Sequence, residues 1–319
     1  MAISPHKNTE HTGFNLIAMQ TSPPKITIII PTSCTAIRAD SLRRAIASIQ
    51  EAGPGLTVIL IAANGPHIDP ALAAELSERP DLDFIRFEEG SSPKTLSLAV
   101  PLVNTDYFGF LDDDDELLPN SLQQRLATLH HHSDADIVLS NGYLRKQGED
   151  ILYLQHLEKV PLNPLATFFI ENWLPSCGAL FRRTGVETSY FQNYHPYAEW
   201  SWLAFCLALD QKRFCILDKP TFRVYADTPT SLSKSSEYRH SYISLYQKML
   251  AMNPPPDIFK TIQKRLSQAH HDVSSWVLTE GKISNAIRHH LLSLWHSSGW
   301  RFLPYTRHII IAALKNKAG

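Results

Sequence analysis

Cysteine is scarce in this chain of 319 residues. Its four cysteines are far apart and form no CxxC pair, so neither a disulfide framework nor a thiolate zinc site is indicated. A reducing compartment, the cytoplasm, is therefore expected. Long apolar runs are also missing: none approaches the roughly 20 residues that a helix needs to cross a bilayer, and no signal-peptide core is visible. The cysteines are Cys34, Cys177, Cys206 and Cys215.

The sequence has no excess of either charge. Its 30 Lys and Arg residues nearly balance its 31 Asp and Glu residues, which gives a formal net charge of −1. This balance argues against a polybasic nucleic-acid binder, so no nucleic-acid partner is expected. Because 44% of the residues are apolar, disorder across the whole chain is not expected either. The length suits one large domain, or a domain with a smaller attachment.

Apolar runs of strand length alternate with segments of helical spacing over the first 140 residues. The first run, Ile26–Ile30, is rich in β-branched residues and ends at Pro31, as expected of a strand buried on both faces. We therefore predict an α/β fold with an open, mostly parallel sheet and helices on both faces. Further strands are predicted at 56–62, 84–87, 107–111 and 137–139, and helices at 42–49, 69–76, 93–103 and 119–129.

Three segments of the chain differ in pattern. Residues 1–24 are polar and are predicted to form a flexible arm. Residues 25–236 hold the α/β alternation and then a mixed stretch, whereas residues 237–319 repeat apolar side chains at helical spacing and are predicted to form a C-terminal helical region. In the mixed stretch, strands are predicted at 143–145, 179–182 and 222–225, and a helix at 198–209.

Five acidic residues, Asp112–Glu116, directly follow the predicted strand at 107–111. Two carboxylates about 6 Å apart repel by roughly 3 kcal/mol at an effective dielectric constant near 20. A divalent cation such as Mn²⁺ or Mg²⁺ would offset this repulsion, and ligands of open α/β sheets bind beyond the carboxyl ends of the strands. The alternative is a solvated acidic turn, with Asp115 and Glu116 at the N-terminus of a helix that Pro119 opens.

Four blocks stand in the order and spacing of a known enzyme family: Ile26–Thr32, Leu42–Ile49, Ile61–Gly65 and Phe110–Pro119. Over about residues 25–135, and more loosely to about 235, the chain resembles a family 2 glycosyltransferase of the GT-A fold. The resemblance implies inverting transfer of a sugar from a nucleotide-diphosphate donor to a glycan or lipid-linked acceptor, with Mn²⁺ or Mg²⁺, in cell-envelope polysaccharide synthesis.

The resemblance also implies roles for single residues. It assigns donor binding to a Rossmann-like half, residues 25–140, and acceptor binding to residues 141–236. Asn64 is expected near the base or ribose, although this family usually has an acidic residue in that turn. Lys94 is expected near the diphosphate, with a solvated surface lysine as the alternative. The other expected donor residues are Pro31 and Thr32 beneath the base, Asp112 at the ribose or a metal-bound water, Asp114 as direct metal ligand, and Asp113 and Asp115 in support.

An inverting transfer requires a base that takes a proton from the acceptor hydroxyl. Glu199 is the candidate, because Tyr197–Leu203 resembles the acidic and aromatic helix block in which the family has its base. The family more often has a Glu-Asp pair there, and a simple charge at a helix N-terminus is the alternative. On the acceptor side, Gly178 is expected to precede a strand, with a plain turn glycine as the alternative. Trp200 could offer a sugar a stacking face or belong to the core.

The sequence is also compatible with two other functions. A nucleotidyltransferase should have a Gly-rich phosphate loop after the first strand, and residues 31–35 contain no glycine. A non-catalytic nucleotide-sugar-binding protein would explain the departures at Ala63, Ala198 and Tyr225; the last stands where the family often has a histidine.

The C-terminal helices allow two uses. Trp295, Trp300 and Arg301 suit docking on a membrane surface at the inner face, whereas packing back onto the catalytic domain is the commoner use of such helices.

Overall fold

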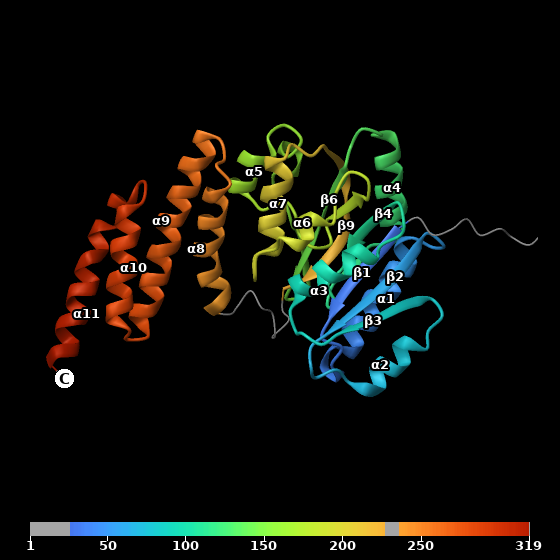
Figure 1. Ribbon diagram of the computed structural model, residues 1–319, viewed down its shortest axis with the longest axis horizontal. Helices are drawn as coiled ribbons and strands as arrows, with labels where there is room; N and C mark the ends of the chain where they lie inside the picture. Colours follow the sequence, from blue (N-terminus) through green and yellow to red (C-terminus); the bar gives the residue numbers. More distant parts are fainter. Residues whose placement is uncertain (1–25, 227–235, 319) are drawn as a thin grey trace, which may run out of the picture.

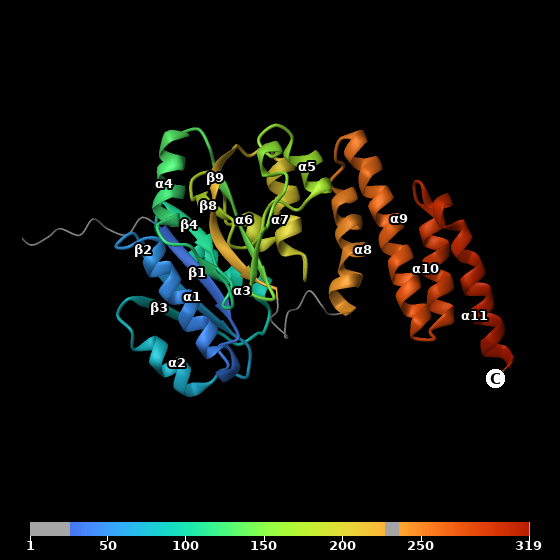
Figure 2. The same cartoon turned by 180° about the vertical axis from the view of Figure 1, so that it is seen from behind.

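The computed structural model describes residues 26–226 and 236–318. The predicted arm at 1–24 lies outside the described residues. An α/β half and a row of C-terminal helices make up the molecule, with α11 at the end farthest from the sheet (Figure 1). The view from behind shows the same order of elements (Figure 2).

The first half consists of parallel βα units, as the sequence predicts. Strands β1, β2, β3 and β4 pair in parallel in the order β3-β2-β1-β4. Helix α2 begins where predicted, because the Asp69 side chain accepts hydrogen bonds from the backbone N–H groups of Ala71 and Leu72. The elements are β1 (Ile26–Thr32), η1 (Ala36–Arg38), α1 (Ala39–Ala52), β2 (Thr57–Asn64), α2 (Pro70–Ser77), β3 (Leu82–Phe87), α3 (Ser92–Ala99), η2 (Val100–Leu102) and β4 (Tyr107–Phe110).

The second half extends the same sheet. The full strand order is β3-β2-β1-β4-β8-β6-β9-β5, with β7 paired to β6. Strand β8 runs antiparallel to both β4 and β6, and β9 runs parallel to β6. The elements are β5 (Glu116–Leu117), α4 (Ser121–His131), β6 (Ile137–Lys146), β7 (Glu149–Leu152), η3 (Leu157–Lys159), α5 (Pro164–Ile170), β8 (Ala179–Arg182), α6 (Ser189–Gln192), α7 (Glu199–Leu209) and β9 (Phe214–Tyr225).

Two local predictions are wrong. The strands predicted at 137–139 and 143–145 are one strand, β6, which continues past register shifts in its pairing with β9. The helix predicted to open at Pro119 begins at Ser121 instead. Glu116 therefore does not lie at a helix N-terminus; it belongs to β5, opposite Arg223 in β9. Sheet pairing outweighs the helix-start signal here, because it satisfies backbone groups and pairs the two charges.

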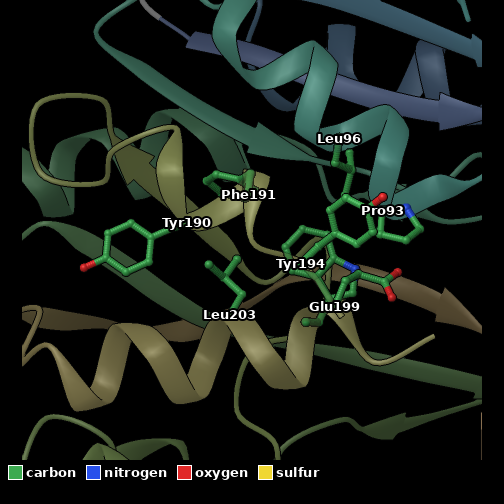
Figure 3. Close-up of a pocket in the computed structure, with 8 residues that line it drawn as sticks. Pro93, Leu96, Tyr190, Phe191, Tyr194, Glu199 and Leu203 are labelled. Carbon is green, nitrogen blue, oxygen red and sulfur yellow. The ribbon is translucent and has the colours of Figure 1, made fainter. Parts of the chain in front are cut away.

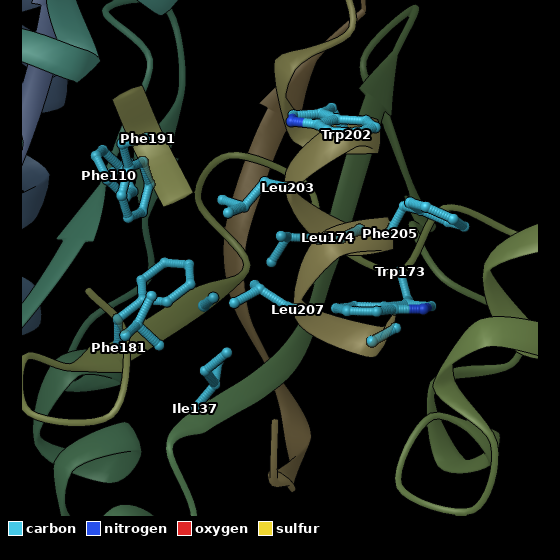
Figure 4. Packing of buried hydrophobic residues seen from close by; sticks show 14 of the residues in the cluster. Phe110, Ile137, Trp173, Leu174, Phe181, Phe191, Trp202, Leu203, Phe205 and Leu207 are labelled. Carbon is cyan, nitrogen blue, oxygen red and sulfur yellow. The ribbon is translucent and has the colours of Figure 1, made fainter. Parts of the chain in front are cut away.

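The main hydrophobic core lies between the sheet and α7. Trp173, Phe181, Phe191 and Trp202 belong to this core, and Phe191 lies next to Phe110 at the end of β4 (Figure 4). Phe108 and Phe181 stack with ring centroids 5.2 Å apart. Because β4 ends in this core, its last residue has little freedom, and the acidic turn that follows begins from a fixed point.

The C-terminal helices are α8 (Ser236–Ala251), α9 (Pro256–Thr279), α10 (Ile283–Trp295), η5 (Gly299–Tyr305) and α11 (Thr306–Ala318). Leu245 and Met249 of α8 and Ile262 of α9 belong to the main core. A separate small core joins α9 to α10 through Val277 and Ala286. None of the described helices is long and apolar enough to span a bilayer.

Candidate active site

The acidic run forms a turn at the carboxyl end of β4. The N–H of Asp115 donates to the carbonyl of Asp112 at 3.1 Å, which closes the turn. Asp113 and Asp115 are buried, whereas Asp112 and Asp114 are partly exposed. The four aspartates therefore alternate between anchoring the turn and facing its open side.

Asp113 fastens the turn to the end of β1. It accepts a hydrogen bond from Thr32 Oγ1 at 2.6 Å and one from Arg38 at 3.0 Å. Asn64, at the end of β2, donates from Nδ2 to the carbonyl of Thr32 at 3.0 Å. Pro31, one residue earlier in β1, is buried. The predicted donor residues of the first two strands thus meet the acidic turn at one edge of the sheet.

Asp115 fastens the turn to β9. Its Oδ1 accepts a hydrogen bond from the backbone N–H of Tyr225 at 3.1 Å. Arg44 of α1 donates to the carbonyl of Asp114 and lies over the Tyr225 ring, 4.3 Å from its centroid. Burial, and then repulsion by Asp112 and Asp114, raises the pKa of Asp115.

Asp112 is held by a turn that precedes β8. Ser176 Oγ donates to Asp112 Oδ2 at 2.7 Å. Gly178 closes that turn by donating from its N–H to the carbonyl of Pro175 at 3.0 Å, and a Cβ at this position would lie 2.6 Å from the Pro175 ring. Only glycine therefore fits the turn that presents Ser176.

A fully buried arginine supports the same turn. Arg125 of α4 donates to the carbonyl of Cys177 at 2.7 Å, to Thr221 Oγ1 at 2.6 Å and to Ser140 Oγ at 3.1 Å. These bonds join α4, β6, β9 and the turn that holds Ser176. Desolvation by burial lowers the pKa of Arg125 to about 10, so the guanidinium remains charged at neutral pH.

The pKa of Asp112 is raised as well. Burial first, and then the charges of Asp114, Asp113 and Glu199, raises the pKa of Asp112 to about 7, against the lowering effect of the Ser176 hydrogen bond. Arg38 Nη1 lies 3.0 Å from carboxylate oxygens of both Asp113 and Asp114, so one guanidinium serves two aspartates.

The residues present fit a divalent cation held by two carboxylates. Asp112 and Asp114 offer hard oxygen ligands, and Mg²⁺ commonly takes one or two carboxylates with substrate phosphates. A cation would also relieve the repulsion that raises the pKa of Asp112. Within the parts of the chain that the structure describes, no group of three or more His, Cys, Asp or Glu side chains is arranged to hold a metal ion. A metal site complete on the protein alone is thus not formed there.

Glu199 is the first residue of α7 and lines a small cavity with Pro93, Tyr194 and Leu203 (Figure 3). The cavity volume is about 20 Å³, enough for about one water molecule. Desolvation by burial raises the pKa of Glu199. Its charge makes only a small contribution to the raised pKa of Asp112.

Trp200 also lines this cavity, and Lys94 lies next to one of its residues. The Trp200 ring meets the Phe110 ring edge-on, with centroids 5.1 Å apart, and is half-buried. Lys94 of α3 forms an ion pair with Glu89 at 2.6 Å. Lys94 follows the cavity residue Pro93 directly, and the Tyr194 charge affects its pKa, so it lies at the border of the site.

Comparison of the sequence with known protein families agrees with an enzyme site at this place. The family model described as "Glycosyl transferase family 2" matches residues 27–190, slightly more than half of the chain. The chain belongs to glycosyl transferase family 2. The resemblance noted in the sequence is confirmed, and the nucleotidyltransferase alternative has no support from this match.

Solved structures show that this glycosyltransferase has the GT-A fold. One is residues 1–349 of TarS from S. aureus in complex with UDP-GlcNAc, with a TM-score of 0.57 and 15% identity over 84% of this chain and 83% of that one. The same part of TarS in complex with UDP gives a TM-score of 0.54 and 15% identity, over 81% of this chain and 74% of that one. A search of curated protein sequences found no match.

Sequence reasoning missed several residues that shape the glycosyltransferase site. Arg38 precedes the first helix by one residue and has no motif around it. Ser176 and Arg125 gain their positions only through the pairing of β8 and β6. Tyr225 was identified as a departure from the family pattern, yet its contact with Asp115 is made by the backbone N–H.

Ser176→Ala tests the hydrogen bond to Asp112. Without this hydrogen bond, the pKa of Asp112 rises above its value of about 7 in the parent. At higher pH the carboxylate is then charged without the Ser176 donor, which destabilises the fold. We expect a loss of about 2 kcal/mol in the free energy of unfolding at pH 8.5, and a smaller loss at pH 6, where Asp112 is mostly protonated in both variants. Urea unfolding in EDTA at both pH values measures this.

The matched control is Ser33→Ala, an exposed serine near the same edge of the sheet. It should change stability by less than about 0.5 kcal/mol at either pH. An equal loss at pH 6 and pH 8.5 for Ser176→Ala would contradict the account of Asp112.

Proposed function

We propose that this glycosyltransferase is an inverting enzyme that moves a sugar from a nucleotide-diphosphate donor to a hydroxyl of a glycan or lipid-linked acceptor. The observation that supports this best is that Trp200, next to Glu199 at the start of α7, packs edge-on against Phe110, which precedes the acidic run at the end of β4. It places groups suited to a diphosphate next to a carboxylate suited to proton removal. Work on cell-envelope polysaccharide is part of the proposal.

The donor is proposed to bind at the edge where β1, β2 and β4 end. Pro31 and Thr32 lie beneath the base in this proposal, Asn64 faces base or ribose, and Asp112 and Asp113 face the ribose side. TarS was solved with UDP and with UDP-GlcNAc, and we propose a uridine nucleotide here by analogy of fold. Lys94 would bring positive charge toward the diphosphate by leaving Glu89.

Asp114 and Asp112 would hold Mn²⁺ or Mg²⁺, which supplies positive charge to the departing diphosphate. Arg38 adds a fixed positive charge beside Asp114. The remaining chemistry belongs to side chains of the protein. Ser176 orients Asp112 through a single hydrogen bond, and Gly178 keeps the turn that presents it.

Glu199 is proposed as the base. An acceptor oxygen forms the new bond to the anomeric carbon, the bond from that carbon to the diphosphate oxygen breaks, and the hydroxyl proton passes to the Glu199 carboxylate. Burial raises the pKa of Glu199, which makes its ionised form a stronger base than an exposed glutamate. Trp200 would bound the acceptor side of this space, one residue farther along α7.

Glu199→Gln is expected to lower the transfer rate by at least about 100-fold, because the amide cannot accept the proton. UDP affinity should change by less than about twofold. In the parent, the rate should fall as pH decreases through a pKa that burial places above the usual glutamate range. Sugar transfer is followed by nucleotide release from UDP-GlcNAc and other nucleotide sugars across pH 5–9.

Glu187→Gln, on an exposed residue outside the cavity, is the control and should keep the parent rate. A Glu199→Gln enzyme with near-parent transfer would remove Glu199 from the role. Tight UDP binding by the parent without release from any donor would favour the non-catalytic nucleotide-sugar-binding protein.

Asp114→Asn tests the metal proposal without measuring activity. With UDP and Mn²⁺ near 100 times Kd, the melting temperature of the parent should rise by about 5 °C. Asp114→Asn should lose most of this rise, since the amide is a poorer ligand than a carboxylate. Asp134→Asn, an exposed aspartate away from the acidic turn, should keep it. A Mn²⁺-dependent rise of the same size in Asp114→Asn would exclude Asp114 as a ligand.

We further propose that α10, η5 and α11 contact an anionic membrane surface, at the cytoplasmic face. Trp295 and Trp300 are 87% and 75% exposed, and Leu291, Leu303 and Leu314 of the same segment are also exposed. Residues 281–319 contain six Lys and Arg residues and no Asp or Glu. Exposed tryptophans together with an excess of basic residues suit the headgroup region of anionic lipid.

Vesicle sedimentation of the full chain tests this contact. The parent should pellet with vesicles containing 30% phosphatidylglycerol, bind phosphatidylcholine vesicles less, and release at 0.5 M salt because screening weakens the attraction. Trp295→Ser with Trp300→Ser should lower the bound fraction roughly tenfold. Leu162→Ser, at an exposed leucine of the α/β half, is the control. Absence of the parent from the pellets would overturn the contact.

A further inference from the structure

A large groove lies between α8 and α9, apart from the cavity beside Glu199. Its volume is about 400 Å³, within the range of roughly 300–1,000 Å³ that small-molecule sites occupy. Three tyrosines of α8, an arginine, an aspartate and a tryptophan of α9 are among the residues that line it. They are Tyr238, Tyr242, Tyr246, Arg265, Asp272 and Trp276.

The tyrosines form a ladder along one face of α8. Positions 238, 242 and 246 are four residues apart, so their side chains lie above one another on successive turns. Tyr238 and Tyr242 meet edge-on with centroids 5.4 Å apart, and their hydroxyls are 2.8 Å apart. Tyr242 and Tyr246 follow at 5.9 Å. A row of half-buried aromatic rings with hydroxyl tips offers a ligand apolar faces and hydrogen bonds together.

The α9 side of the groove is polar, with both signs of charge. Gln268 donates from Nε2 to Asp272 Oδ1 at 2.7 Å, and Arg265 lies one helical turn before Gln268. Arg265 and Asp272 carry opposite charges, and Arg301 donates to Gln268 Oε1 at 3.0 Å. Donors and acceptors thus stand together on this side of the groove, and they suit a neutral ligand rich in hydroxyl groups.

Helix α8, which lines the groove, packs against α7 and the segment that precedes it. Lys248 of α8 lies over the Trp202 ring of α7, 4.1 Å from its centroid. Lys248 donates to the carbonyl of Tyr194 at 2.9 Å, and His195 Nε2 lies 3.0 Å from Ser244 Oγ.

We propose that the groove between α8 and α9 binds a neutral oligosaccharide chain and leads its acceptor end toward Glu199. The ring faces of Tyr242 and Trp276 contact sugar rings, while Asp272 and Gln268 bond to hydroxyl groups. This inference rests on the proposed function, because it makes the groove an acceptor subsite of the same transferase. It gives the C-terminal helices a part in the choice of acceptor.

Saturation-transfer NMR on the full chain tests the groove with cellotetraose, chitotetraose and maltotetraose as probes. The parent should bind at least one tetrasaccharide, and Tyr242→Ala should weaken that binding by roughly tenfold, as loss of a central aromatic contact does. Tyr242→Phe, which keeps the ring, should retain most of it. Asp272→Ala, at an exposed position that tolerates substitution, should also weaken binding, whereas the neighbouring surface variant Lys264→Ala should not.

The outcomes separate this inference from the proposed function when UDP binding is measured on the same samples. If the parent binds UDP but none of the tetrasaccharides, the proposed role of the groove is wrong and the proposed function is not affected. Tetrasaccharide binding that Tyr242→Ala and Asp272→Ala weaken, in a parent that binds no nucleotide, supports the groove and overturns the transferase. Binding that neither variant changes places the saccharide elsewhere and overturns the groove.

Discussion

The whole site depends on one electrostatic constraint, the burial of Asp113 and Asp115 in the acidic run that follows a single strand. A carboxylate that loses water must gain donors or positive charge from the protein. Asp113 obtains them from Thr32 and Arg38, and Asp115 from a backbone N–H of β9. These partners come from separate parts of the chain, so the turn can form only when the sheet is assembled.

The same requirement explains how the two halves of the sheet are joined. Asp112 depends on Ser176, and the turn that presents Ser176 depends on Gly178 and the buried Arg125. Arg125 is costly to bury, but it satisfies a carbonyl and two hydroxyls from three elements at once. The two halves of the sheet are therefore connected through hydrogen bonds, in addition to the shared apolar core.

The sequence predicted the parts of the fold that depend on local pattern. The β-branched run at Ile26–Ile30, the cap at Asp69 and the acidic run after β4 each have a signal within a few residues, and each lies where expected. Arg38 and Ser176 have no such signal, because their partners are 75 and 64 residues away. The extent of β6 was missed for the same reason, since its ladder with β9 continues through register shifts that side-chain alternation does not reveal.

The bond from the main chain at position 225 has a consequence for how freely the site can vary. Every amino acid except proline has the N–H that Asp115 accepts, so the anchor does not depend on which side chain occupies that position. A tyrosine in place of the family's frequent histidine therefore leaves the turn intact, and its ring forms a cation–π contact with the Arg44 guanidinium. The last residue of β9 can thus diverge while the architecture around it is preserved.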